Sequence, residues 1–220
     1  MQYATLSLPP PILNVYAERI TKLNSVPQLS DFPVAWSRFV GGLQTEGLAF
    51  EFLGGTYMVI VFGLLQSSSL AANPVCTFLG ITCAIASVFS VAYKPVFRSI
   101  MSRMSDPWRG LAWVQASMDI PTSSWNSAPR LLAVPAVWLA WATVALIAFL
   151  LYEAWAGLRD VSSTTPSSPR LNILLSVFIT IELLVGLVQA VYVVPAFAKL
   201  CEPGGHASTL DGQRGEPEVV

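Results

Sequence analysis

The sequence predicts an all-α integral membrane protein, built as a bundle of about four transmembrane helices. Charged residues make up 11% of its 220 residues, whereas an ordinary soluble domain has about 25%. Residues 52–93 and 131–152 contain no Asp, Glu, Lys or Arg, and residues 171–198 contain only Glu182. As a helix, the first of these stretches would be roughly 63 Å long, about twice the hydrocarbon core, so we expect it to cross the membrane twice.

Residues 1–47 precede the membrane domain and are expected to form a cytoplasmic N-terminal segment. Within it, residues 14–24 have the pattern of a short amphipathic helix, with Tyr16, Ile20 and Leu23 on one face. The remainder contains two helix-breaking prolines and four apolar residues that suit the membrane interface before the first span: Pro27, Pro33, Trp36, Phe39, Val40 and Leu43.

The membrane domain is expected to occupy residues 48–199. A serine run and an Asn-Pro pair separate the first two spans, and a Ser/Thr/Pro-rich loop separates the last two. Lys94 and Pro95, a charge and a helix breaker, are expected to end the second span. The last segment is polar and contains glycines, which predicts a disordered cytoplasmic tail. The four spans and the tail have these approximate bounds: 48–66, 75–93, 131–152, 172–197 and 200–220.

The central loop, residues 94–130, is expected to lie in the cytoplasm and to contain an amphipathic helix. Apolar and basic side chains separate onto two faces at helical spacing, a pattern typical of a helix that lies in the membrane plane on an anionic leaflet. The apolar face would hold Phe97, Ile100, Met101, Met104 and Trp108, and the polar face would hold Arg98, Ser102, Arg103 and Ser105.

The distribution of Lys and Arg predicts the orientation. Ten of these residues lie in the N-terminal segment, the central loop and the tail, whereas the two remaining loops hold only Arg159 and Arg170. Since cytoplasmic loops carry the excess of Lys and Arg, we expect both termini and the central loop to face the cytoplasm.

Small residues form a stripe along the second span at spacings of four, three, four and three, which predicts a close helix–helix contact. Candidate partner surfaces occur in the first and third spans. The rival interpretation, a thiol site, is weak because two cysteines seven residues apart on a helix lie too far from each other for a disulfide or a shared metal. The stripe is Cys76, Gly80, Cys83, Ser87 and Ser90, and the candidate partners are Gly54, Gly55, Gly63, Ala136, Ala140 and Thr143.

Glu182 is the residue in the spans that most needs a reason, since an acid at that depth costs about 2.5–3.5 kcal/mol on insertion scales. Gly186 and Gln189 follow on the same face of the helix. No Lys, Arg or His lies at membrane depth to pair with Glu182, so we expect it to face the bundle interior as the protonated acid. The favoured interpretation is an interhelical hydrogen bond, and the alternative is a carboxyl group that handles protons or substrate.

The sequence contains no catalytic, cofactor-binding or metal-binding set of residues. The only histidine is His206 in the tail, no Asp lies in any span, and phosphate-binding glycine motifs are absent. Three cysteines give neither a disulfide framework nor a metal pattern. Cys201 directly follows the last span beside Lys199, a position that suits S-palmitoylation, although an unmodified thiol is the other interpretation. We therefore expect no cofactor.

One stretch resembles a known group of proteins. Residues 133–142, Ala-Val-Pro-Ala-Val-Trp-Leu-Ala-Trp-Ala, together with Asp-Pro-Trp-Arg at 106–109, look like uncharacterised small multi-pass membrane proteins of filamentous fungi. The resemblance covers mainly the third span and the loop before it, and it implies no activity, ligand or site residue.

Three classes of function follow from these features. The favoured one is a non-enzymatic accessory or organising protein, with the lipid bilayer and a membrane-protein partner or a second copy of the chain as its partners. The alternative is a small oligomeric transporter or channel. Its polar path could draw only on Thr56, Tyr57, Glu182 and Gln189. An enzyme is the least favoured class, and a net charge of −1 does not suit a nucleic-acid partner.

Overall fold

The computed structural model describes residues 10–66, 73–103, 106–120, 127–156 and 169–200, and in these residues every regular element is an α-helix. There are six: α1 (Pro10–Asn24), α2 (Phe32–Leu65), α4 (Pro74–Arg103), α5 (Pro107–Asp119), α6 (Ala128–Ala156) and α7 (Pro169–Leu200). Four of them, α2, α4, α6 and α7, are long and apolar enough to cross a membrane. The predicted fold class, an all-α bundle with about four membrane-spanning helices, is therefore confirmed.

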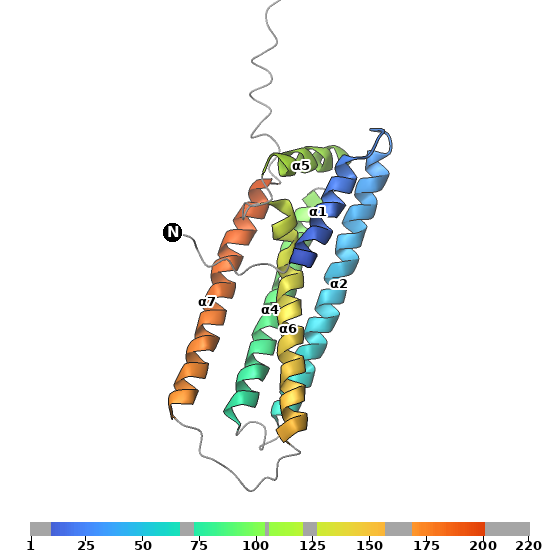
Figure 1. Ribbon diagram of the computed structural model, residues 1–220. Coiled ribbons are helices and arrows are strands. Elements are labelled where there is room, and N and C mark those ends of the chain that lie inside the picture. Colours follow the sequence, from blue (N-terminus) through green and yellow to red (C-terminus); the bar gives the residue numbers. More distant parts are fainter. Residues whose placement is uncertain (1–9, 67–72, 104–105, 121–126, 157–168, 201–220) are drawn as a thin grey trace, which may run out of the picture.

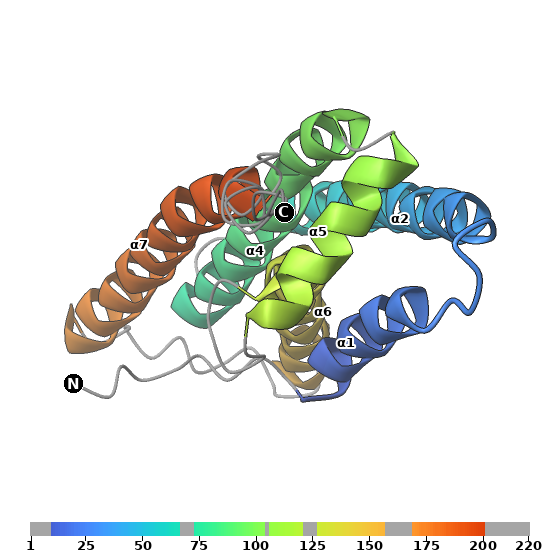
Figure 2. The same cartoon turned by 90° about the horizontal axis from the view of Figure 1, so that it is seen from above.

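Helix α4 is the centre of the bundle and packs against α2, α6 and α7 (Figure 1). Seen along the bundle, α2 and α7 lie on opposite sides of α4, and α5 lies across one end (Figure 2). Helix α1 packs beside α2 and α6 in the half of the bundle nearest α5. The ends of α1 and α7, the starts of α2 and α6, and the whole of α5 are thus at the same end of the bundle.

Helix α1 confirms the short amphipathic helix that the sequence predicts. Tyr16, Ile20 and Leu23 are all buried on its inner face. The Tyr16 hydroxyl donates to the Glu46 carboxylate on α2 at 3.2 Å, and Arg19 forms an ion pair with the same carboxylate. These contacts hold α1 against the first half of α2.

Helix α2 begins at Phe32, sixteen residues before the predicted start of the first span at 48. Pro33 does not interrupt it, because Pro33 lies in the first turn, where the backbone N–H that proline lacks has no partner within the helix. Trp36 and Phe39, which the sequence predicts to suit the membrane interface, pack against Trp113 of α5 at ring distances of 5.9 and 6.4 Å.

Lys94 and Pro95, which the sequence predicts to end the second span with a charge and a helix breaker, do not end the helix, since α4 continues through both residues to Arg103. A proline inside a helix removes one hydrogen bond and costs about 3 kcal/mol. Packing on both sides of Pro95 offsets this cost: Tyr93 and Met101 are each buried, and Lys94 forms an ion pair with Glu51 of α2.

The basic segment after Lys94 is therefore the end of α4 rather than a separate helix. The element that lies across the bundle is α5. Asp106 is its N-cap, and the Asp106 carboxylate accepts a hydrogen bond from the Trp108 N–H at 3.1 Å. Pro107 occupies the first helical position. Its apolar face is buried through Trp113 and Val114.

The small-residue stripe of α4 lies at helix–helix contacts. All five of its members are buried. A Cβ added at Gly80 would lie 2.9 Å from Leu65 of α2, and one at Gly54 would lie 2.9 Å from Val91 of α4, so a larger residue at either position would have to displace its neighbour on the facing helix. Gly55 and Gly63, predicted to belong to the same surface, have nothing within 4 Å, and this part of the prediction is wrong.

Two polar contacts mark the ends of the apolar part of the bundle. At one end Lys94 pairs with Glu51, and at the other Asn73 Nδ2 donates to the Tyr152 hydroxyl at 3.2 Å. Residues 74–93 of α4 separate the two contacts, about 30 Å of helix. Since a bilayer's hydrocarbon core is about 30 Å thick, these contacts lie where its two boundaries are expected.

Candidate functional site

The polar residues that the sequence singles out in the fourth span lie on the side of α7 that meets α4 and α6. Gly186 is buried, and Glu182 and Gln189 are half-buried, whereas most of the other residues of this span are exposed. Helix α7 therefore presents Glu182, Gly186 and Gln189 to the bundle and most of its large apolar residues outward.

Gly186 and Gln189 belong to one junction of three helices. The ring of Phe89 on α4 lies directly over Gly186, so a Cβ at that position would overlap the ring. Phe89 also contacts Trp138 of α6, with ring centroids 4.9 Å apart. The Trp138 Nε1–H donates to Gln189 Oε1 at 2.8 Å, which closes the contact back onto α7. We call these four residues the Phe89 junction.

Glu182 lies about one turn from this junction and faces α4, where Thr82 and Cys83 are its polar neighbours. The Thr82 hydroxyl is buried beside the carboxyl group, and no hydrogen bond of regular geometry satisfies it. The carboxyl group is thus the neighbour with which the Thr82 hydroxyl can exchange a hydrogen bond. The arrangement suits interhelical polar contact of the kind that stabilises membrane bundles.

The other two polar candidates lie elsewhere in the bundle. The Thr56 hydroxyl donates to the carbonyl of Phe52 within α2 at 2.8 Å. The Tyr57 hydroxyl is hydrogen-bonded to Thr143 of α6 at 3.1 Å. Since α2 and α7 lie on opposite sides of α4 (Figure 2), the structure does not bring Thr56 and Tyr57 together with Glu182 and Gln189.

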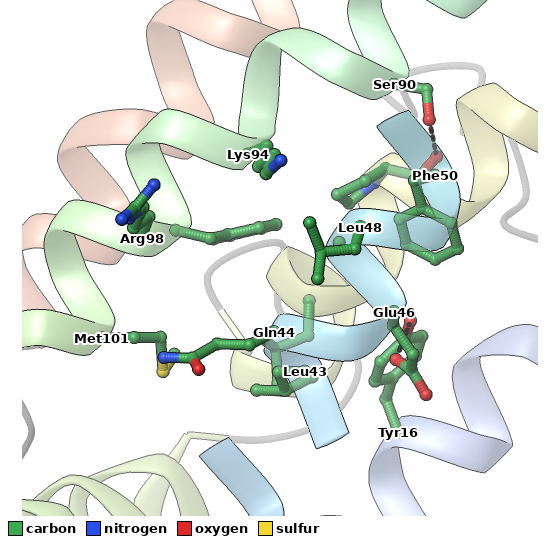
Figure 3. Close-up of a pocket in the computed structure, with 14 residues that line it drawn as sticks. Tyr16, Leu43, Gln44, Glu46, Leu48, Phe50, Ser90, Lys94, Arg98 and Met101 are labelled. Atoms are coloured by element: carbon green, nitrogen blue, oxygen red, sulfur yellow. Dashed lines mark hydrogen bonds between the residues drawn. The ribbon is translucent and has the colours of Figure 1, made fainter. Parts of the chain in front are cut away.

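A cavity of about 330 Å³ lies between α1, α2, α4 and α6 near the Lys94–Glu51 pair. We call it the α2–α4 cavity, and Figure 3 shows its lining. Lys94 and Arg98 line one side from α4, and Tyr16 and Glu46 lie opposite them (Figure 3). The rest of the lining is mostly apolar and comprises Leu43, Gln44, Gly47, Leu48, Phe50, Ser90, Phe97, Met101, Leu132 and Pro135.

The charges around the α2–α4 cavity are partly neutralised. Glu46 pairs with Arg19 and accepts from Tyr16, and Lys94 pairs with Glu51. Burial raises the pKa of the Tyr16 hydroxyl, and the neighbouring Glu46 carboxylate raises it further, so this hydroxyl remains a donor at neutral pH. The Ser90 hydroxyl donates its hydrogen bond to the Pro135 carbonyl of α6 at 3.0 Å.

Sequence reasoning did not identify this cavity. The available signal was the pair of basic residues one turn apart, but Lys94 was assigned to the end of the second span and Arg98 to the polar face of a separate helix. Only the continuation of α4 past Pro95 brings Arg98 to the same side of the cavity as Lys94, opposite Glu46.

The remaining chemistry of the described residues is sparse. Cys76 and Cys83 are buried free thiols. Within the parts of the chain that the structure describes, no three His, Cys, Asp or Glu side chains are grouped closely enough to hold a metal ion. Cys201, the candidate for lipidation, and the expected disordered tail lie outside the described residues.

Comparisons of the chain with protein-family profiles, with curated proteins and with solved structures found no match. Interpretation of function therefore depends on the arrangement of the chain's own residues.

Proposed function

We propose that this chain is a non-enzymatic accessory or organising protein of a membrane, which acts through helix packing rather than by conducting a solute. The observation that carries the proposal is the separation of its polar groups. Gln189 is hydrogen-bonded to Trp138 at the α6–α7 contact, whereas Tyr57 is hydrogen-bonded to Thr143 at the α2–α6 contact. Each group stabilises a different contact between helices. A packed scaffold needs polar groups placed in this way, whereas a polar path through the membrane needs them next to one another.

The outer surface of α7 supports the same proposal. This helix contacts the bundle mainly through α4. Only 6% of the residues in its most apolar 18-residue stretch are buried. A peripheral helix of this kind offers a long apolar surface within the membrane. Its partner would be another membrane protein or a second copy of the chain.

Flux measurements on the reconstituted protein test the choice between scaffold and transporter. Liposomes that contain the purified chain should pass protons and small ions no faster than protein-free liposomes. Glu182→Gln keeps the shape and hydrogen-bonding capacity of the side chain, so it should preserve assembly, whereas Glu182→Leu should weaken the association of α7 by about 1 kcal/mol. A parental flux that a normally folded Glu182→Gln variant loses would favour the transporter and contradict our proposal.

Photo-crosslinking in native membranes tests the partner. A photoreactive residue at Val188, which is 52% exposed on α7, should join the chain to a defined protein, either another copy or one recurring partner. Crosslinks to lipid alone, with the protein at its native level, would contradict an organising role for this surface.

A further inference from the structure

We propose that the α2–α4 cavity binds the anionic headgroup of a membrane phospholipid, with Arg98 and Lys94 contacting its phosphate. Such a site would suit a scaffold or a transporter equally, so it does not depend on the function proposed above. Three properties of the cavity support it: its depth in the membrane, its charge and its mixed lining.

The depth is that of a lipid headgroup. The cavity lies beside the Lys94–Glu51 pair, which marks one end of the apolar part of the bundle. Its other charged residues, Glu46 and Arg98, lie on the side away from the apolar belt, about one turn further along α2 and α4. A phospholipid of the surrounding leaflet would therefore have its phosphate at the level of these residues without leaving the bilayer.

The charge favours an anion. Among the described residues, three charged side chains line the cavity, Glu46, Lys94 and Arg98. Glu46 pairs with Arg19, and Lys94 pairs with Glu51. Arg98 lines the cavity and has no ion-pair partner among the residues that the structure describes. One positive charge is thus left over, which matches a phosphodiester with a single negative charge. A guanidinium group binds such an oxyanion through two parallel N–H donors.

The lining suits an amphiphile better than a free anion. Apolar side chains of three helices, including Leu48, Phe97 and Leu132, line the cavity together with the polar groups. A volume of about 330 Å³ is at the lower end of the usual range for ligand pockets, enough for a headgroup with its glycerol. The acyl chains would remain in the bilayer beside the helices. Basic pockets between membrane-spanning helices are a known way of binding acidic lipids.

Native mass spectrometry of the full-length protein in mild detergent, titrated with phosphatidylglycerol or phosphatidylcholine, tests the proposal. Phosphatidylglycerol should bind more tightly than phosphatidylcholine. Arg98→Gln should weaken phosphatidylglycerol binding about fivefold, the loss expected for one basic residue close to an anionic lipid. The matched control is Arg109→Gln, which removes the same charge from an exposed position of α5 outside the cavity and should leave binding unchanged.

Two further variants act in opposite directions and keep the test independent of folding losses. Glu51→Gln frees Lys94 from its carboxylate and should strengthen phosphatidylglycerol binding. Gly47→Leu places a side chain in the cavity, where the helix has room for a Cβ, since the nearest atom, Lys94 Cγ, is 4.0 Å away. This variant should fold and lose specific binding.

Three results would overturn the proposal. The first is equal binding of the two lipids by the parent protein. The second is equal loss of binding in Arg98→Gln and Arg109→Gln, which would indicate a diffuse surface charge. The third is displacement of phosphatidylglycerol by millimolar inorganic phosphate, which would assign the cavity to free phosphate rather than to a lipid.

Discussion

Single residues of the Phe89 junction show how this bundle attaches its most peripheral spanning helix. Phe89 contacts both Gly186 of α7 and Trp138 of α6. Trp138 is fixed in turn by its hydrogen bond to Gln189. Helices in lipid gain no hydrophobic energy by meeting one another, so close packing at small residues and polar contacts must supply the attraction. Here both occur within one turn of α7.

The first prediction at this scale is that Gly186→Ala destabilises the bundle. A Cβ at this position would overlap the Phe89 ring, and the close contact of that ring with Trp138 limits its freedom to move. Overpacking of this kind costs about 1–3 kcal/mol. Thermal unfolding in detergent should therefore occur at a lower temperature than for the parent.

The matched control is Gly63→Ala in α2, where nothing lies within 4 Å of the new Cβ. Both substitutions bring the same gain in helix propensity, about 0.5–1 kcal/mol, so the difference between the two variants isolates the steric clash. Equal unfolding temperatures for the two variants would show that α7 does not pack on Phe89 in the way described.

At the scale of the elements, α5 closes one end of the bundle through an aromatic group. Trp36 of α2 contacts Phe32, Phe39 and Trp113 at ring distances of 6.2, 5.6 and 5.9 Å. The indole of Trp36 also lies against Gly110 of α5, where a Cβ would overlap it. The early start of α2 thus has a structural purpose, because it extends the helix far enough to receive α5.

This contact leads to a prediction about α5 alone. Gly110→Ala should push α5 away from Trp36 and speed hydrogen exchange of the α5 backbone amides. Overpacking of this kind costs about 1–3 kcal/mol, and α5 is a short helix at one end of the bundle. Gly41→Ala in the same part of α2, with nothing within 4 Å, should leave that exchange unchanged. Unaltered exchange of α5 in Gly110→Ala would argue against its docking on Trp36.

At the scale of the whole molecule, the number and approximate centres of the spans were predictable because insertion into lipid depends on composition along the chain. The ends of the helices were less predictable, because neither Pro33 nor Pro95 ends a helix. Pro33 lies in a first turn, where its missing N–H has no partner to lose, and packing around Pro95 compensates for the hydrogen bond that it removes. The α2–α4 cavity was not predictable at all. It depends on Glu46 of α2 and Lys94 of α4, which are far apart in the sequence but line the same cavity.

The candidate site shows the same division. Depth and spacing identified Glu182 and Gln189 as residues that need a reason, but they could not identify the neighbours. Trp138 and Phe89 carry no signal that separates them from other aromatic residues in a span, and their role follows only from the way α6 and α7 flank α4.

Orientation in the membrane is the last prediction, and it concerns the molecule as a whole. The described Lys and Arg residues of α1, α5 and the adjoining ends of α2, α4 and α6 lie at one end of the bundle (Figure 1), and ten of the chain's twelve lie in segments assigned to the cytoplasmic side. Protease-sensitive tags at either terminus, or inserted between residues 121 and 126, should be cleaved from the cytoplasmic face of sealed vesicles. A tag inserted near residue 163 should be protected until detergent is added. Cleavage of that tag in intact vesicles, with the other three protected, would invert the orientation and place the α2–α4 cavity in the opposite leaflet.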